Sequence, residues 1–336
     1  MSFLDGKSVL ISGSTGMIGS QIIKKIVLDN TAQKIKTKII ALYRNEKKRK
    51  EVFSDISNDK DIKWIQCDIN KPLEDMGQID YIIHTAGVTG GSKKHVTFPM
   101  DTINTAINGT INLLELARKS AVKGFVYLSS LEIYGKTGFD IPSIKETDGG
   151  YIDSMAVRSS YSESKRMCET ICSSYCKQYD VPAKVVRLTA TYGTGASYED
   201  NRVLCEFARC IVEKKDIVLH SYGDTIRNYC DVSDAVNAIL LVLEKGDVGT
   251  AYNIANMSTE ISIKELALRC IELYPKSNTT LNFDILDNIT ELGYNNVVKI
   301  RLDSTKLMAL GWEPTVGINQ IIKNVVQTYK MYRENG

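Results

Sequence analysis

The chain has 336 residues, enough to bury a sizeable core, and its 43% hydrophobic and 24% charged content is ordinary for a globular protein. Its 42 basic and 40 acidic side chains nearly cancel, so nothing in the net charge calls for a nucleic acid or an anionic membrane as a partner. The sequence predicts no signal peptide, no membrane-spanning run, no metal site among its three histidines and no disulfide among its eight cysteines. We therefore expect a cytoplasmic protein.

Short apolar runs rich in β-branched residues alternate with helical patterns up to about residue 188. The predicted strands are 8–12, 38–43, 63–67, 81–84, 124–129 and 183–188, and the clearest helices are 18–28, 102–120 and 160–179. This alternation predicts an α/β fold with a Rossmann-type, doubly wound parallel sheet. Longer loops, a helix at 202–213 and a strand at 216–220 then predict a smaller C-terminal substrate-binding lobe. We assign residues 1–188, with a return at about 228–256, to the dinucleotide-binding domain, and 189–227 with 257–336 to this lobe.

A glycine-rich turn follows the first predicted strand and opens the first predicted helix. Its sequence is Gly13-Ser14-Thr15-Gly16-Met17-Ile18-Gly19. In a dinucleotide-binding turn, glycines permit a tight bend and let the backbone approach the pyrophosphate, whose charge rests at the helix N-terminus. The position of the turn between strand and helix predicts a cofactor held by Gly13, Thr15, Gly16, Met17, Ile18 and Gly19.

The end of the second predicted strand bears on which dinucleotide binds. An acidic residue there would hold the adenosine ribose of NAD, whereas an arginine can hold the 2′-phosphate of NADP. This strand ends in Ala41-Leu42-Tyr43-Arg44-Asn45, without a carboxylate. Arg44 therefore predicts NADP over NAD.

Tyr161 and Lys165 lie four residues apart near the start of a predicted helix, which places them on one face. A phenol with an ordinary pKa of about 10 is a poor base at neutral pH, but an adjacent ammonium favours the phenolate. The pair is therefore predicted to act as a general base on a substrate hydroxyl. The strand at 124–129 ends in Ser129 followed by Ser130, and Ser130 is the candidate donor that polarises the reacting oxygen.

Together these features resemble the extended short-chain dehydrogenase/reductase family, especially its nucleotide-sugar epimerases, dehydratases and decarboxylases. Besides the turn and the Tyr161/Lys165 pair, the resemblance includes the segments 67–69, 84–87, 129–135, 187–193, 227–232, 251–254, 301–303 and 310–314. It implies further cofactor contacts from Asp68, Ile69, Ala86, Gly87 and Ser129, and from Tyr161 and Lys165 themselves. It also implies that Tyr161 removes the proton of a sugar 4-hydroxyl while hydride passes to the nicotinamide, leaving a 4-keto sugar.

Glu132 bears on the chemical step after this oxidation. It lies two positions after Ser130, where 4,6-dehydratases and glucuronate decarboxylases of the family carry a catalytic glutamate. A 4-ketone acidifies C5, so a carboxylate there can act as the C5 base. Leu131 replaces an aspartate common in hexose dehydratases, and Ala190 replaces an asparagine that normally helps to hold substrate phosphate.

The resemblance also implies a set of substrate-binding residues, namely Arg158, Thr191, Arg202, Arg227 and Arg301. Arg227 is similar to the family's diphosphate-binding arginine, and Arg301 is the expected second clamp, because a guanidinium suits forked recognition of phosphate. Arg158 and Arg202 resemble residues of the glucuronate decarboxylases.

The prediction is thus an NAD(P)-dependent nucleotide-sugar epimerase or dehydratase acting through a 4-keto intermediate. Two alternatives stay open: a nucleotide-sugar decarboxylase of the UDP-glucuronate type, and an NADPH-dependent 4-keto-sugar reductase, which Arg44 favours. A non-catalytic dinucleotide-binding relative would be expected to lack Tyr161 or Lys165, and both are present. A homodimer through helices 102–120 and 160–179 is the family expectation.

Overall fold

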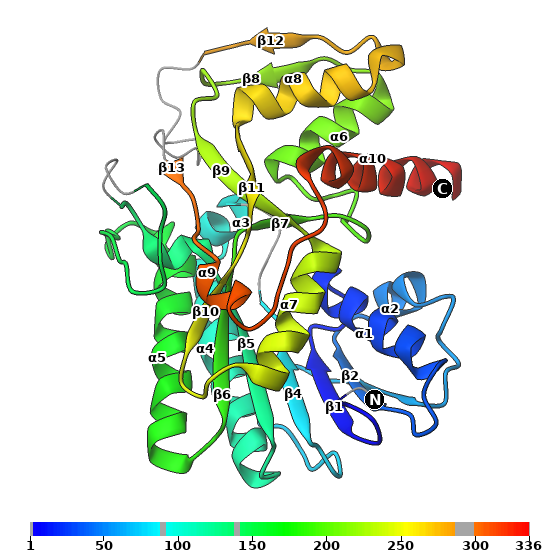
Figure 1. Cartoon of the computed structure of the whole chain (residues 1–336), viewed down its shortest axis with the longest axis vertical. Helices are drawn as coiled ribbons and strands as arrows, with labels where there is room; N and C mark the ends of the chain where they lie inside the picture. The colour runs from blue at the N-terminus through cyan, green and yellow to red at the C-terminus, as the bar shows by residue number, and fades with distance from the viewer. Residues whose placement is uncertain (1–2, 88–91, 138–141, 286–298, 336) are drawn as a thin grey trace.

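Seven parallel strands form the central sheet of the computed structural model, which describes residues 3–87, 92–137, 142–285 and 299–335 (Figure 1). The strand order is β3–β2–β1–β4–β5–β6–β10, with the order reversing beside β1. The predicted doubly wound parallel sheet is confirmed. The strands are β1 (Ser8–Ser12), β2 (Lys38–Tyr43), β3 (Ile62–Gln66), β4 (Tyr81–His84), β5 (Gly124–Ser130), β6 (Ala183–Leu188) and β10 (Ala251–Ile254).

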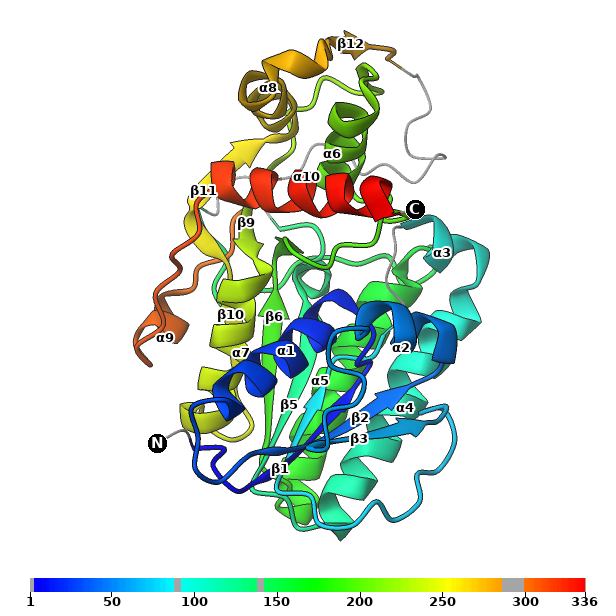
Figure 2. The ribbon, with the colours of Figure 1, turned by 90° about the vertical axis from the view of Figure 1, so that its right-hand side faces the viewer.

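Helices cover both faces of this sheet (Figure 2). On one face lie α1 (Met17–Asn30) and α7 (Val232–Lys245), and on the other α4 (Pro99–Lys119) and α5 (Ser159–Tyr179), while α2 (Glu46–Val52) follows β2. Val9 and Ile11 of β1 share a core with α1 and α7, whereas Leu10 between them shares a core with α4 and α5. A strand buried on both sides is what a sheet wrapped by helices requires.

A smaller lobe lies beyond one end of the central sheet (Figure 1). Its sheet has the order β11 (Asn256–Ser262), β9 (Ile226–Asp231), β13 (Lys299–Ile300), with β7 (Ala190–Tyr192) beside β9. A second pair joins β8 (Ile217–Leu219) to β12 (Leu281–Phe283). The main helices are α6 (Val203–Glu213), α8 (Ile263–Leu273) and α10 (Ile318–Asn335), which share one apolar core. The chain re-enters the central sheet with β10, whereas β9 belongs to the smaller sheet.

Short elements join these parts: α3 (Ser92–Thr97), α9 (Thr305–Met308) and the 3-10 turns η1 (Leu131–Tyr134) and η2 (Pro275–Ser277). The carboxyl ends of β1, β4 and β5 meet at one edge, since Ser12 pairs with His84 and His84 with Tyr127. This edge faces the smaller lobe (Figure 1). None of the helices in the described ranges combines the length and apolar character needed to span a bilayer.

Candidate active site

The glycine turn packs against the turn that follows β4. Gly13 has a φ of +66°, and a Cβ there would lie 2.6 Å from the Ala86 Cα, so glycine alone fits without displacing that backbone. A Cβ on Gly19 would lie 2.5 Å from the Gly13 carbonyl oxygen. Thr85 Oγ1 donates to the carbonyl oxygen of Ser12 at 2.6 Å, which joins the two turns. The glycines therefore bring Ala86, with Gly87 after it, against the glycine turn.

The N-terminus of α1 fits a dinucleotide pyrophosphate. Gly16 is the N-cap residue and is exposed, and no side chain in the described part of the chain caps the helix. Thr15, Met17 and Ile18 around it are half-buried. The first backbone N–H groups of a helix have no intrahelical acceptor, and they favour an anion. The glycine turn and these free donors form a cradle in which the predicted cofactor residues lie together.

Three other predicted cofactor residues lie past the ends of β2 and β3. Arg44 and Asp68 are exposed, and the Arg44 carbonyl oxygen accepts from Gln66 Nε2 at 3.0 Å. Ile69 is buried, and its carbonyl oxygen accepts from Asn112 Nδ2 at 2.8 Å. The two charged side chains at this end of the cradle are therefore open to solvent.

A buried polar chain supports the turn after β4. His84 Nδ1 lies 2.9 Å from Ser12 Oγ, and His84 Nε2 lies 3.1 Å from Thr110 Oγ1 on α4. Thr110 Oγ1 in turn donates to Cys168 Sγ on α5 at 3.3 Å. Burial, together with the charge of Lys165, lowers the pKa of His84 to about 3, so its ring is neutral. The chain ties the cofactor edge of the sheet to α4 and α5.

Tyr161, in the first turn of α5, lies beside Ser130 and Glu132. Burial raises the pKa of Tyr161 to about 12, the Ser130 hydroxyl lowers it by hydrogen bonding, the Glu132 carboxylate raises it and the Arg202 guanidinium lowers it. The phenol is therefore protonated at neutral pH. Side chains from β5, η1 and the start of α6 thus act together on the pKa of this phenol on α5.

Lys165 lies on the same face of α5 as Tyr161, but its ammonium is held elsewhere. Lys165 Nζ donates to the carbonyl oxygen of Leu128 at 2.7 Å and lies 5.9 Å from the centroid of the Tyr161 ring. Burial lowers the pKa of Lys165 to about 8. The causes that shift the Tyr161 pKa here are burial, Ser130, Glu132 and Arg202, so the role of Lys165 in favouring the phenolate stays a prediction.

Glu132 stands between Ser130 and Arg158. Its backbone N–H donates to Ser130 Oγ at 3.2 Å, so the serine caps the η1 turn and fixes where the carboxylate begins. Arg158 Nη1 lies 3.6 Å from Glu132 Oε2, and the two side chains are 33% and 27% exposed. Arg158 Nε is buried without a partner among the described residues. The Glu132 carboxylate and the Arg158 guanidinium therefore lie next to each other, and both are partly exposed.

The structure does not bring Ser129 to this group. Its hydroxyl donates to Glu169 Oε1, and Glu169 pairs with Arg187 at 2.7 Å. Successive residues of a strand point to opposite faces, so Ser129 turns away from the face that carries Ser130. A cofactor contact of Ser129 would have to come from its backbone.

Arg202 reaches the site while remaining tied to its own loop. It pairs with Asp200 at 2.8 Å, donates to the Thr191 carbonyl oxygen at 2.9 Å and stacks 4.5 Å over the Tyr192 ring. The Thr191 hydroxyl is buried and donates to the Thr189 carbonyl oxygen at 3.0 Å. The Thr191 backbone therefore positions Arg202. The Thr191 side chain is already hydrogen-bonded to the Thr189 carbonyl oxygen.

Arg227 and Arg301 lie close together in the smaller lobe, because Arg227 pairs in register with Ile300. The Nε atoms of both are buried without a partner in the described residues. Arg301 Nη2 forms an ion pair with Glu260 Oε1 at 2.7 Å. Each of these two arginines thus keeps one buried N–H donor that a phosphate oxygen could accept from.

Residues 9–255 match the family model described as the NAD dependent epimerase/dehydratase family. The chain belongs to this family. The predicted family and the prediction of a nicotinamide-dependent enzyme are therefore confirmed. The match begins in β1 and ends just after β10, so it covers the whole central sheet, together with Tyr161, Lys165 and Glu132.

Several members of the NAD-dependent epimerase/dehydratase family are similar over nearly the whole chain. A dTDP-D-glucose 4,6-dehydratase from Bos taurus is 29% identical, covering 98% of this chain and 89% of the relative. UDP-glucuronic acid decarboxylase 4 from Arabidopsis thaliana is 28% identical, covering 96% and 68%. The crystal structure of a UDP-glucose 4-epimerase from Thermotoga maritima, with UDP-glucose, has a TM-score of 0.82 at 22% identity and covers 97% of this chain and 99% of that one. This last likeness shows the fold.

Two aromatic rings near Lys165 and Tyr161 were not predicted as site residues from the sequence. The Tyr127 ring on β5 lies 4.6 Å from Lys165 Nζ, and the His95 ring on α3 stacks on Tyr161. Tyr127 stands two positions before Ser129 on a strand that was predicted. For His95 the sequence offers no signal, because α3 lies far from α5 along the chain.

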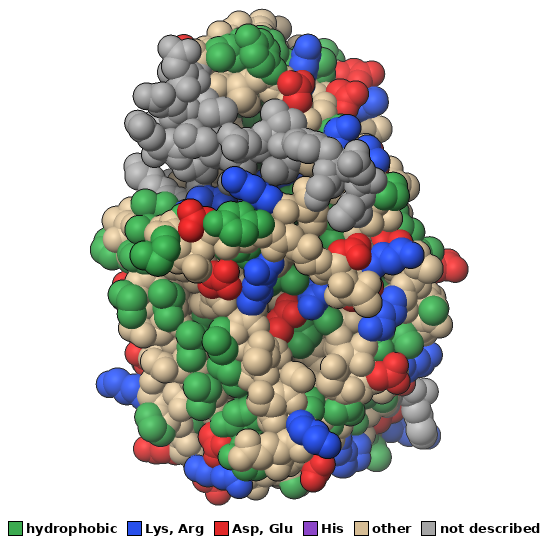
Figure 3. All heavy atoms as spheres, turned by 90° about the vertical axis from the view of Figure 1, so that its left-hand side faces the viewer, with side chains coloured by type: hydrophobic (Ala, Val, Ile, Leu, Met, Phe, Trp, Pro, Cys, Tyr) green, Lys and Arg blue, Asp and Glu red, His purple; other side chains and the backbone are tan. Residues whose placement is uncertain are grey.

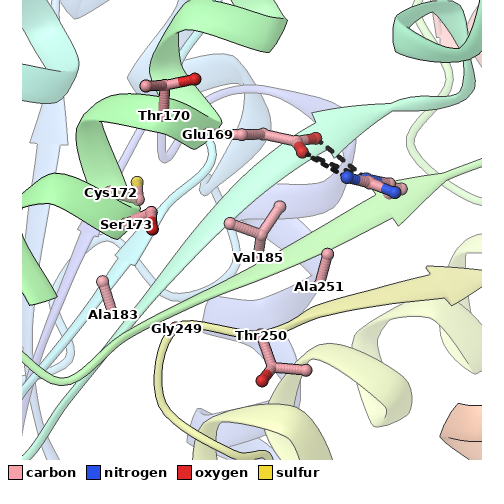
Figure 4. Close-up of a pocket in the computed structure, with 10 residues that line it drawn as sticks. Glu169, Thr170, Cys172, Ser173, Ala183, Val185, Gly249, Thr250 and Ala251 are labelled. Atoms are coloured by element: carbon pink, nitrogen blue, oxygen red, sulfur yellow. Dashed lines mark hydrogen bonds and ion pairs between the residues drawn. The ribbon is translucent and has the colours of Figure 1, made fainter. Parts of the chain in front are cut away.

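A cavity of about 310 Å³ lies apart from these residues, between α5 and the edge of the sheet at β6 and β10 (Figure 4). It is lined by Glu169, Thr170, Cys172, Ser173, Ala183, Val185, Arg187, Gly249, Thr250 and Ala251. Its two charged residues are paired with each other (Figure 4). The cavity contains neither the glycine turn nor Tyr161 and is not the predicted active site.

Proposed function

We propose that the chain oxidises a nucleotide-linked sugar at C4 and then remodels it at C5, as an epimerase or dehydratase. The observation that carries this proposal is the placement of Glu132 beside Tyr161 and Ser130. A simple oxidation or reduction needs one proton-transfer group, whereas this site holds a phenol and a separate carboxylate. The relatives named above, a 4,6-dehydratase and a glucuronic acid decarboxylase, support it.

A nicotinamide held in the cradle would accept the hydride from C4. Tyr161 first loses its own proton to solvent and then, as the phenolate, accepts the proton of the sugar 4-hydroxyl, while Ser130 donates a hydrogen bond to the same oxygen. Arg202 and Ser130 shift the Tyr161 pKa toward the phenolate, while Glu132 opposes them. When Glu132 accepts the C5 proton it loses its charge and no longer raises the Tyr161 pKa. The phenol then gives up its proton more readily, so protonation of Glu132 and deprotonation of Tyr161 are coupled.

Arg158 favours a decarboxylase as the second candidate. A guanidinium 3.6 Å from Glu132 can hold a carboxylate on C5 of the sugar. Leu131, where hexose dehydratases often carry an aspartate, is buried and supplies no proton. A uronic acid substrate would need no such donor for a departing hydroxyl.

Arg227 and Arg301 are the proposed clamp for the substrate diphosphate. Their Nε donors are buried without partners in the described chain. We propose on these grounds that the smaller lobe, residues 189–227 and 257–336, binds the nucleotide end of the substrate. Residues 1–188, with the return of the chain in α7 and β10, bind the cofactor; the predicted return at about 228–256 is shortened at its start because β9 belongs to the smaller sheet.

Arg44 carries a prediction about the cofactor. Its exposed side chain at the end of β2 is placed to meet a 2′-phosphate, and we expect NADP to bind more tightly than NAD. The family description names NAD, and a dTDP-glucose 4,6-dehydratase from Streptomyces venezuelae has been solved with NAD, so the comparisons give this preference no support. Titration of tryptophan fluorescence with both cofactors decides the matter. Arg44→Ala should weaken NADP alone, and clearly tighter NAD binding to the native chain contradicts the prediction.

We further propose a homodimer that buries the outer face of α5. Apolar side chains gather on the side of the molecule that α5 presents (Figure 3). Met167 of α5, and Met155 and Val157 just before it, are exposed. Light scattering after gel filtration should give twice the mass of the 37.5 kDa chain. All eight cysteines are free, which suits the predicted cytoplasmic location.

The proposed activity is tested by incubating the purified chain with a panel of UDP-, dTDP- and GDP-linked sugars, without added reductant. Mass spectrometry should detect an epimer, a loss of water or a loss of carbon dioxide from one of them. Turnover that occurs only when NADPH is supplied in stoichiometric amounts would instead establish the 4-keto-sugar reductase.

A further inference from the structure

His95 lies directly against the phenol that the proposed reaction uses. The imidazole and Tyr161 ring centroids are 4.4 Å apart, and the ring planes are 28° from parallel, which is a stacked arrangement. His95 is 9% exposed and belongs to the short helix α3. The proposed reaction gives this residue no part.

Two further contacts fix the position of His95. Its Nδ1 lies 3.2 Å from Thr102 Oγ1 on α4, and its carbonyl oxygen accepts from Ser160 Oγ at 3.2 Å. Ser160 immediately precedes Tyr161 on α5. His95 therefore joins α3, α4 and the start of α5, and the ring is held by Thr102 while the backbone is held next to Tyr161.

The stacked ring restricts Tyr161 in two ways. A phenol in the first turn of a helix can swing about its side-chain torsions, and a packed ring on one face limits that swing. The same ring keeps water from that face, and burial is the largest cause of the raised Tyr161 pKa. A misplacement of a reacting group by about 1 Å can cost about 100-fold in rate.

We infer that His95 is a positioning residue that holds Tyr161 in its reactive orientation through ring stacking. The inference rests on the proposed function, in which Tyr161 handles the substrate proton. It predicts that the aromatic ring, and not the imidazole nitrogen chemistry, carries the effect. Phenylalanine, which keeps a flat ring at the same site, should therefore replace histidine far better than alanine does.

The test compares His95→Ala with His95→Phe on a substrate that the native chain turns over. For His95→Ala we expect kcat to fall about 10- to 100-fold, as for a misplaced catalytic group, with KM and cofactor affinity within about threefold. His95→Phe should recover most of that loss. Phe3→Ala, which removes a ring packed on Tyr81 at the amino ends of β1 and β4, away from the site, is the matched control and should keep native kcat.

Three results would overturn the inference: native kcat in His95→Ala, no recovery in His95→Phe, or a rise in KM in place of the fall in kcat. If His95→Ala does not fold, as judged by circular dichroism, Ser160→Ala takes its place, because it removes the hydroxyl that holds the His95 backbone beside Tyr161 and should lower kcat with KM unchanged. Native kcat in Ser160→Ala and loss of kcat in His95→Phe would then both count against stacking. Tyr161→Phe run beside these variants separates the cases, since its full activity would refute the proposed function itself.

Discussion

Tyr161→Phe is expected to lower kcat about 10³-fold, within the range found for removal of a general acid–base group. The substitution deletes the hydroxyl that Ser130, Glu132 and Arg202 influence, and it keeps the ring that packs on His95. Cofactor affinity and the melting temperature should stay near their native values, because the ring fills the same space. Steady-state kinetics on the identified nucleotide sugar measure the effect.

Tyr175→Phe is the matched control for this prediction. Tyr175 lies on the same helix, and its hydroxyl donates to Glu115 Oε1 at 2.8 Å, away from the site. This variant loses one hydrogen bond, costing about 1 kcal/mol of stability, and should retain kcat. Equal kcat values in Tyr161→Phe and Tyr175→Phe would remove Tyr161 from the mechanism.

Gly13→Ala is expected to lower cofactor affinity more than tenfold, a loss of at least about 1.4 kcal/mol of binding free energy. The new Cβ would meet Ala86 Cα at 2.6 Å and Ala86 N at 2.7 Å, so the glycine turn and the turn after β4 must move apart. Both turns line the proposed cradle, and neither can move without distorting it. Fluorescence titration with NAD and NADP measures the loss.

Gly77→Ala separates this displacement from backbone strain. Gly77 has a φ of +90°, but a Cβ there meets nothing within 4 Å. Each alanine costs about 1–2 kcal/mol for its left-handed conformation, so both variants should lose some stability. Only Gly13→Ala should also lose the cofactor, and unchanged affinity in that variant would show that the cradle lies elsewhere.

Much of the central sheet could be predicted from the sequence. The predicted strands at 8–12, 38–43, 81–84 and 183–188 match the observed bounds, because strands buried on both faces are continuous apolar runs that end at turn residues. α4 begins at Pro99 and not at residue 102, since proline fits the first turn of a helix although it breaks the apolar spacing. The smaller sheet was not predictable, as β7, β9, β11 and β13 come from distant segments.

The sequence predicted which residues belong to the candidate site better than it predicted the contacts that they make. The four-residue spacing placed Tyr161 and Lys165 on one face of α5, but it could not show that Lys165 Nζ binds the Leu128 carbonyl oxygen. Strand alternation alone would have separated Ser129 from Ser130. His95 could not be found, because only the packing of α3 brings it to Tyr161.

The division of labour between Tyr161 and Glu132 is tested most directly by solvent deuterium exchange. The native chain and Glu132→Gln are each incubated with the identified nucleotide sugar in deuterium oxide, and the sugar is analysed by mass spectrometry and proton NMR. The native chain should introduce deuterium at C5, whereas Glu132→Gln should lose this exchange and still oxidise C4, seen as reduced cofactor by its near-ultraviolet absorbance. Deuterium at C5 in Glu132→Gln at the native rate would show that another group is the C5 base.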